Sequence, residues 1–418
     1  MKHVALALML ATPAVAQENP IDRIRPDAPE LAPYGEHTVG VRTMTFTRPD
    51  VVDVVNSTEE GNMTRYDREI TVEVFYPAAE GTEAGGTYTA YLRDGETQAT
   101  LTGRAARDAA PAEGSFPLVL ISHGYPGNRF LMAHLAENLA SKGYVTASID
   151  HPDSTYSDIG AFGSTLYNRP QDQSFVLDQM ASLGGDLGGI VDASRTGLVG
   201  YSMGGYGALI FSGAGLEEGG WPERYTPPGN LLSELRVGAD RLAEIHDDRL
   251  AATVAIGPWG RNRGFWSQEG LSNIDVPLMI VAGSQDDVSG YDAIRTIFDE
   301  TTGTTRHLLT YQGANHNAAA PMPAPQEAWG DPAVFGHYAD AVWDTTRMNN
   351  ILQHFVTAFM DLHLKDDQSK AEYLDLVETA DDGTYAMEDG QPTEDHTYWK
   401  GFPERSAKAL RFETKEPQ

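Results

Sequence analysis

Cysteine is absent from this 418-residue sequence. The chain therefore cannot use disulfide bonds for stability, and free-thiol chemistry is excluded. Basic residues are also scarce: 30 Lys and Arg stand against 60 Asp and Glu, which gives a formal net charge of −30. Such a charge repels nucleic-acid phosphates and anionic lipid headgroups, so we expect neither as a partner.

Apolar runs long enough to span a membrane are missing as well, so we expect no stable membrane insertion. The apolar run at the N-terminus, in MKHVALALMLATPAVAQENP, is short, follows Lys2 and ends in Ala14-Val15-Ala16. A basic start, a short apolar stretch and a small-x-small site are typical of a secretory signal peptide. We expect cleavage after Ala16 and export to the periplasm or the medium.

The remaining pattern predicts an α/β protein. Residues 17–38 are polar and Pro-rich and predict a flexible lead-in, whereas 39–47 and 68–78 alternate like two antiparallel strands. Residues 93–114 resemble a loop. Short apolar runs then recur between helix-length segments such as 129–143, which predicts a mostly parallel sheet with helices on both faces. These runs lie at 116–124, 144–151, 195–200, 251–257, 276–283 and 306–314.

The spacing of these runs predicts one domain over 39–365, with inserts near 152–194 and 212–250. Both inserts can overhang a site at the carboxyl ends of the strands. We expect helices over 230–246 and 337–364, and a further helix that starts at Arg169 with Pro170 in its first turn. Residues 366–418 form an extension that we expect to pack on the domain.

A single serine is surrounded by glycines in the stretch Gly200-Tyr201-Ser202-Met203-Gly204. A strand that turns sharply into a helix leaves no room for a Cβ two residues before or after the turn, so glycine is favoured at both places. Gly-x-Ser-x-Gly between a strand and a helix is the pattern of a nucleophile elbow. The pattern can arise by chance in a glycine-rich chain, but here a strand-like run precedes it and a helix-like run follows.

A serine nucleophile needs a histidine base, and the histidine needs an acid that holds its tautomer. In this type of sheet the order along the chain is serine, acid, histidine, each at the carboxyl end of a strand. Asp286 follows the run 276–283, and His316 follows the run 306–314. Asp287 is a rival acid, and we favour Asp286 because Val288 can then anchor the loop. His307, His354 and His363 fall inside expected strands or helices and are weaker candidates.

Two backbone N–H groups are expected to bind the oxyanion. One is the N–H of Met203, which follows the nucleophile at the start of a helix. The other is the N–H of Tyr125, in the loop that follows the strand ending at His123-Gly124. His123 precedes the nucleophile in the chain, so we expect it to form hydrogen bonds within this loop and not to be the base.

Two further residues are candidates for contact with substrate. His151, with Asp153 and Ser154, follows the strand at 144–151, and Trp259 follows the strand at 251–257. Trp259 can equally pack a loop. The acidic residues near His151 can hold a cation, but we favour a solvated or hydrogen-bonded loop, and we expect no metal or other cofactor.

The motifs SHGYPGNR, GYSMGG, GSQDDV and GANH together resemble the α/β-hydrolases, in particular the secreted branch akin to dienelactone hydrolases and platelet-activating-factor acetylhydrolases. Polyester hydrolases are more distantly similar. The resemblance covers about 68–365 and the ending YWKGFPERSAKAL, and implies an α/β-hydrolase fold with antiparallel N-terminal strands. It implies a triad of Ser202, Asp286 and His316 and an oxyanion hole of Tyr125 and Met203. Dienelactone hydrolases use a cysteine, so their lactone chemistry is not implied.

These residues predict a secreted serine esterase that acts on a small or polymeric ester through an acyl-enzyme. An amidase or peptidase of the same fold remains an alternative, although the region before 116 is too short for the propeller of a prolyl oligopeptidase. A binding protein on a hydrolase scaffold is a third alternative. Acyl group, alcohol and oligomeric state are left open.

Overall fold

The computed structural model describes residues 18–58, 62–219 and 221–418. The signal peptide expected over 1–16 and the first residue of the lead-in lie outside these ranges. Within them, no helix is both long enough and apolar enough to cross a bilayer.

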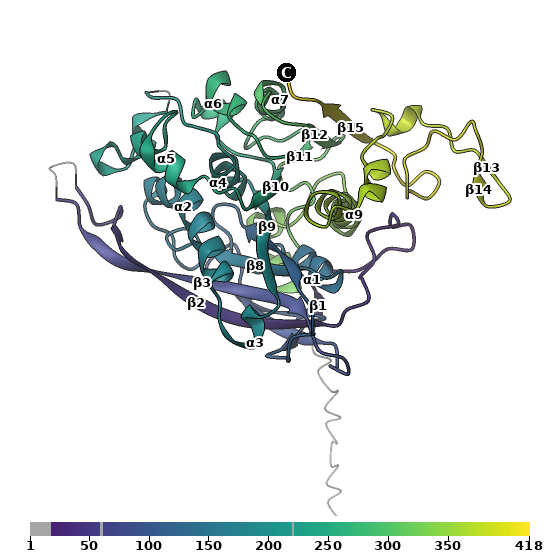
Figure 1. Cartoon of the computed structure of the whole chain (residues 1–418), viewed down its shortest axis with the longest axis horizontal. Coiled ribbons are helices and arrows are strands. Elements are labelled where there is room, and N and C mark those ends of the chain that lie inside the picture. The colour runs from purple at the N-terminus through teal and green to yellow at the C-terminus, as the bar shows by residue number, and fades with distance from the viewer. Residues whose placement is uncertain (1–17, 59–61, 220) are drawn as a thin grey trace, which may run out of the picture.

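A large twisted sheet forms the centre of the molecule (Figure 1). Its strands in chain order are β2 (Val39–Val52), β3 (Arg65–Pro77), β6 (Ala106–Arg107), β7 (Phe116–Ser122), β8 (Val145–Asp150), β9 (Val191–Tyr201), β10 (Leu250–Ile256), β11 (Leu278–Gly283), β12 (Arg306–Tyr311) and β15 (Leu410–Lys415). Their order in space is β15-β12-β11-β10-β9-β7-β8-β3-β2-β6. Strands β7 to β12 are parallel, whereas β2, β3 and β15 pair antiparallel with their neighbours β3, β8 and β12.

Helices cover both faces of this sheet, because its central strands are apolar on both sides. One face is covered by α1 (Ala133–Ser141) and α9 (Thr345–Leu364). The other face is covered by α2 (Phe162–Ala181), α4 (Met203–Phe211), α5 (Asp240–Ile245), α6 (Gln268–Ser272) and α7 (Tyr291–Glu300). The short helices α3 (Gly185–Gly188) and α8 (Pro332–Gly336) lie in connections.

The position of β7 between β8 and β9 determines where a crevice opens. From β7 the chain continues to α1 on one face, and from β9 it continues to α4 on the other. The loops after these two neighbouring strands therefore diverge. A crevice at the carboxyl ends of the strands is expected at such a reversal of strand order.

The lead-in is packed against the domain where the structure describes it, in contrast to the flexible segment expected over 17–38. Strand β1 (Asn19–Pro20) pairs with β5 (Gln98–Gly103), which pairs with β4 (Gly86–Tyr91) in a small second sheet. Ile21 and Ala32 are buried. The Asn19 amide donates to the Thr100 carbonyl and to Glu327. These partners are distant in sequence, so a search for local patterns does not find them. The loop expected over 93–114 contains β5, and β4 was not predicted either.

The C-terminal extension continues the main sheet through β15 and lies beside α9, in yellow in Figure 1. It also holds a small hairpin of β13 (Met387–Glu388) and β14 (Gln391–Pro392). Phe412 of β15 stacks on Phe355 of α9 with ring centroids 5.0 Å apart. Apolar contact therefore joins the extension to the domain.

Three expected helices differ in extent from those observed. The helix expected from Arg169 begins at Phe162, so Pro170 lies in its interior and not in its first turn. Residues 228–235 contain 3-10 turns interrupted by a kink at Gly229 and Asn230, which have φ of 67° and 53°. They are separate from α5, because Gly238 adopts φ +75° between them. The helix expected over 337–364 begins only at Thr345, where Asp344 caps it by accepting the N–H of Arg347.

Buried neutral histidines predict an acid-sensitive fold. Burial lowers the pKa of His151 and of His354 to about 3, and that of His307 to about 4, from the ordinary 6.5. Between pH 6.5 and 4 the unfolded chain then binds more protons than the folded chain, so stability rises with pH in this window. We expect full stability above pH 6.5 and a loss of ~1.4 kcal/mol per pH unit for each imidazole as the pH falls. Urea unfolding between pH 7.5 and 4 measures this slope, and a flat profile contradicts it.

Candidate active site

The nucleophile elbow predicted at Ser202 is present between β9 and α4. Ser202 has φ 53° and ψ −108°, a backbone conformation that side-chain-bearing residues rarely adopt. A Cβ on Gly200 would lie 2.3 Å from the Gly204 carbonyl oxygen, and one on Gly204 would lie 2.0 Å from the Ser122 carbonyl oxygen. Only glycine fits at both positions, as the sequence indicated.

Ser202, His316 and Asp286 form a continuous hydrogen-bonded row. His316 Nε2 lies 2.9 Å from Ser202 Oγ, and His316 Nδ1 lies 2.7 Å from Asp286 Oδ2. An ionised carboxylate only accepts, so Nδ1 carries the proton and Nε2 is free to accept the serine hydroxyl. The three residues follow β9, β12 and β11, parallel strands whose carboxyl ends lie at the same edge of the sheet, with β10 between β9 and β11.

Asp286 is buried and its charge is well compensated. Burial alone would raise its pKa, but the hydrogen bond with His316 and the N–H groups of Ser289 and Val288 outweigh burial and lower the pKa. Asp287 is exposed to solvent. The reason given for Asp286 from the sequence is wrong, since Val288 is 43% exposed and anchors nothing. The turn is held instead by the second oxygen of the Asp286 carboxylate.

The two N–H groups predicted for the oxyanion hole belong to segments that adjoin Ser202. A Cβ on Gly124 would lie 3.4 Å from Ser202 Cβ, so the loop that carries Tyr125 passes directly against the serine. Met203 is the first residue of α4, where an N–H has no partner within the helix. The Ser202 carbonyl accepts from Tyr206 N–H at 3.0 Å and from Trp259 N–H at 3.2 Å. Because C=O and N–H of one peptide point in opposite directions, these bonds turn the Met203 N–H the other way.

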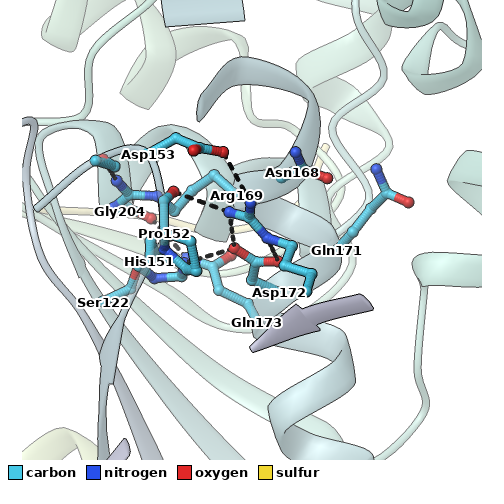
Figure 2. Close-up of polar contacts among 12 residues, drawn as sticks. Ser122, His151, Pro152, Asp153, Asn168, Arg169, Gln171, Asp172, Gln173 and Gly204 are labelled. Carbon is cyan, nitrogen blue, oxygen red and sulfur yellow. Dashed lines mark hydrogen bonds and ion pairs between the residues drawn. The ribbon is translucent and has the colours of Figure 1, made fainter. Parts of the chain in front are cut away.

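His151 does not reach the site, which corrects the prediction that it contacts substrate. Its side chain is 1% exposed, and both ring nitrogens are occupied. Nε2 lies 2.8 Å from Ser122 Oγ, and Nδ1 lies 3.1 Å from Asp172 Oδ2 (Figure 2). The ring turns inward because Asp172 of α2 lies beneath the end of β8, a pairing of distant residues that the sequence does not show.

The side chains of the acidic loop after His151 are also bonded to residues outside the row Ser202–His316–Asp286. Asp153 pairs with the buried Arg68 guanidinium at 2.9 Å, and Ser154 Oγ accepts from Arg169. Arg68 comes from β3, more than eighty residues earlier in the chain. The hydrogen-bonded loop is thus the alternative that the geometry favours over a cation site.

Trp259 belongs to an aromatic cluster beside Ser202. Its ring is 7% exposed and lies 5.4 Å from Phe162 and 5.8 Å from Tyr225, measured between ring centroids. Phe162 in turn contacts Tyr125 at 4.9 Å and Tyr225 at 5.2 Å. Tyr125, Phe162 and Tyr225 are half-buried. We call these three residues with Trp259 the aromatic wall.

Several residues of this region were not found from the sequence. Phe162 and Tyr225 belong to the two inserts, where no periodic pattern marks them. On the opposite side, the Tyr201 ring lies 5.3 Å from the His316 ring, and its hydroxyl donates to Asn317 at 3.2 Å. Tyr201 precedes Ser202 and Asn317 follows His316 in the chain, and this adjacency was the one signal that could have identified them as residues of the site.

Comparison with known proteins gives matches to ester hydrolases. A family model described as PET hydrolase-like matches residues 105–215, which include β7 and the elbow. The chain is 25% identical over 212 residues to Cutinase 1 of Thermobifida cellulosilytica, which covers 49% of this chain and 62% of that protein. Cutinase of Thermobifida fusca (strain YX) is 25% identical over 212 residues, 49% of this chain and 54% of its own length. The chain thus spans little more than half the length of these relatives.

A solved structure matches over nearly the whole chain. It is the ferulic acid esterase from Streptomyces cinnamoneus, with a TM-score of 0.55 and 19% sequence identity. The match covers 92% of this chain and 99% of that chain. At this identity the likeness shows a shared fold.

Mutation of the two neighbouring acids should have very different effects on kcat. Asp286→Asn keeps the shape but donates where Asp accepts, so His316 is held in the wrong tautomer. We expect ester-hydrolysis kcat to fall about 10⁴-fold. Asp287→Asn, the matched control on an exposed residue, should stay within about twofold, since surface substitutions of this kind change little. Steady-state kinetics of both variants decide the assignment, and a crippled Asp287→Asn with an active Asp286→Asn would reverse it.

Proposed function

We propose that this chain, which belongs to the α/β-hydrolase superfamily, is an exported serine hydrolase that cleaves carboxylic esters. The observation that carries the proposal is the unbroken row Asp286–His316–Ser202 at a strained elbow. The cutinase relatives support an ester as the bond that is cleaved. Export rests on residues 1–16 of the sequence, which the structure does not describe.

The geometry supports a two-step reaction. His316 Nε2 takes the proton of Ser202 as Oγ attacks the carbonyl carbon, and the carbonyl oxygen becomes an oxyanion bound by the N–H groups of Tyr125 and Met203. Asp286 holds the imidazole and stabilises the imidazolium. His316 then gives the proton to the leaving alcohol, and an acyl-enzyme remains. Water, deprotonated by His316, attacks the acyl carbon; the bond to Ser202 Oγ then breaks, His316 returns the proton to Oγ, and the acid leaves.

Substrate contact is assigned to the aromatic wall. Its half-buried rings lie along the loop of Tyr125 and present apolar surface beside the nucleophile. Apolar surface of this kind binds an acyl chain or a flat ring by removing it from water. The wall does not distinguish a small ester from a polymer, and the two remain alternatives as substrates.

Removal of the nucleophile tests the mechanism. Ser202→Ala should lose about 10⁵- to 10⁶-fold in kcat on p-nitrophenyl esters, because the triad acts as a unit. Covalent labelling by a fluorophosphonate should disappear while circular dichroism stays unchanged, since the turn requires its glycines and not the hydroxyl. Unchanged turnover in this variant contradicts the mechanism. Wild-type protein that is neither labelled nor active supports the binding-protein alternative, and faster cleavage of matched anilides than esters supports the amidase.

Shortening one ring of the aromatic wall tests the binding surface. Phe162→Ala should raise KM about tenfold for hexanoyl and benzoyl esters, because a lost apolar contact costs ~1–3 kcal/mol. Acetyl esters, which barely reach the wall, should be affected less. Tyr385→Ala, which removes a 40% exposed ring in the C-terminal extension, is the matched control. An equal effect of Phe162→Ala on acetyl and hexanoyl esters excludes an acyl-binding role.

A further inference from the structure

A buried polar network lies directly behind the loop that carries Tyr125. Figure 2 shows its members between the end of β8 and α2, with Arg169 and Asp172 projecting from the helix toward His151. All of its central side chains are at most 2% exposed: Arg68, Ser122, His123, His151, Arg169 and Asp172. Within the described residues, none of these side chains forms a hydrogen bond with Ser202, His316 or Asp286, so the mechanism above leaves this network unexplained.

The ring of His123 is held in one tautomer by two hydrogen bonds. Its Nε2 accepts the backbone N–H of His151 at 3.2 Å, so Nε2 is unprotonated. Its Nδ1 therefore carries the proton and donates to the carbonyl oxygen of Gly124 at 2.7 Å. Burial lowers the pKa of His123 well below 6.5, which keeps the ring neutral at neutral pH.

This bond determines the direction of the next N–H. The carbonyl of Gly124 and the N–H of Tyr125 belong to the same planar peptide group and point in opposite directions. With the carbonyl turned inward to His123, the N–H of Tyr125 is turned outward. Gly124 lies against Ser202, so the outward side is where an oxyanion on Ser202 forms.

Arg169 holds the preceding peptide of the same loop. Its guanidinium donates to the carbonyl oxygen of His123 and to Ser154 Oγ, and no carboxylate is among its hydrogen-bond partners in the described residues. Burial lowers the pKa of Arg169 to about 9. Burying a cation without a direct counter-ion costs free energy. Here the buried guanidinium fixes the loop and places a positive charge behind the proposed oxyanion hole.

The remaining members hold His123 in place. Asp172 accepts two hydrogen bonds from Arg68, both at 3.0 Å, and one from His151 at 3.1 Å. His151 in turn presents its backbone N–H to His123. The network thus connects β3 and α2 to the peptide that bears the oxyanion donor.

We propose that His123 and Arg169 are positioning residues of the oxyanion hole: they hold the carbonyls of residues 123 and 124 inward and so aim the Tyr125 N–H at the reacting oxygen. This inference rests on the proposed function. It predicts that loss of the His123–Gly124 bond weakens binding of the transition state and leaves binding of the substrate unchanged.

Two isosteric variants separate the bonds of His123. His123→Asn places an amide N–H where Nδ1 lies and keeps the bond to Gly124, but loses the bond to His151. His123→Gln places its amide oxygen where Nε2 lies and keeps the bond to His151, but loses the bond to Gly124. We expect kcat of the Gln variant to fall about 100-fold with KM within about threefold, as for loss of an oxyanion donor. The Asn variant should retain at least about a tenth of wild-type kcat.

A second readout and a control complete the experiment. The rate of fluorophosphonate inactivation should fall in parallel with kcat, because the phosphoryl oxygen occupies the same hole. His354→Gln, which alters a buried imidazole that bonds the Leu31 N–H, should leave kcat within about twofold. Arg169→Lys keeps the charge with a shorter reach, and we expect about a tenfold loss of kcat; it is the second test if the His123 variants do not fold.

The outcomes distinguish the inference from the proposed function. Wild-type protein that is not labelled at Ser202 overturns both. Labelled and active wild-type protein with equal kcat for His123→Asn and His123→Gln, or wild-type kcat in Arg169→Lys, overturns only the positioning role. A rise in KM that accounts for the whole loss in the Gln variant also overturns it.

Discussion

The site depends on one backbone contact, between Gly204 at the start of α4 and the end of β7. A Cβ on Gly204 would lie 2.0 Å from the carbonyl oxygen of Ser122 and 2.9 Å from that of His123. This approach brings the elbow and the loop of Tyr125 together, so that the two connections proposed to supply the oxyanion donors lie side by side. Because β7 leads to α1 and β9 leads to α4, on opposite faces of the sheet, the same two connections then diverge, and a crevice is expected at this place.

The polar network behind that contact shows that residue types alone do not make a catalytic site. Ser122, His151 and Asp172 repeat the bonds of the triad, at 2.8 and 3.1 Å. Ser122 is completely buried on a regular strand, however, whereas the elbow exposes 8% of Ser202. Buried ion pairs add little net stability compared with apolar packing, although removal of one partner costs ~3–5 kcal/mol. The fixed geometry of the network, more than its stability, is therefore what we propose it contributes to the loop of Tyr125.

The sequence predicted the fold class, which the structural likeness confirms, and it named the three residues of the row. It could do so because strand ends are marked by apolar runs, and because the order serine, acid, histidine is a property of the sheet. The errors have a common physical cause. His151 follows a strand as His316 does, and only Asp172 and Ser122, distant in sequence, turn its ring inward. The lead-in at 18–38 is polar and Pro-rich, yet Asn19 finds its partners at Thr100 and Glu327.

The difference between local sequence patterns and contacts of distant residues also explains why the sequence indicates a reaction more readily than a substrate. The reacting groups follow β9, β11 and β12, whose positions are determined by the sheet, and their spacing is therefore constrained by the fold. The rings of the aromatic wall come mainly from elsewhere: Phe162 begins α2 in the first insert, and Tyr225 lies in a 3-10 turn of the second. Inserts leave the sheet untouched when their length and sequence change. The substrate contact that we propose for the wall can therefore change without any change in the row Ser202–His316–Asp286, so the substrate must be determined by measurement on the wall itself.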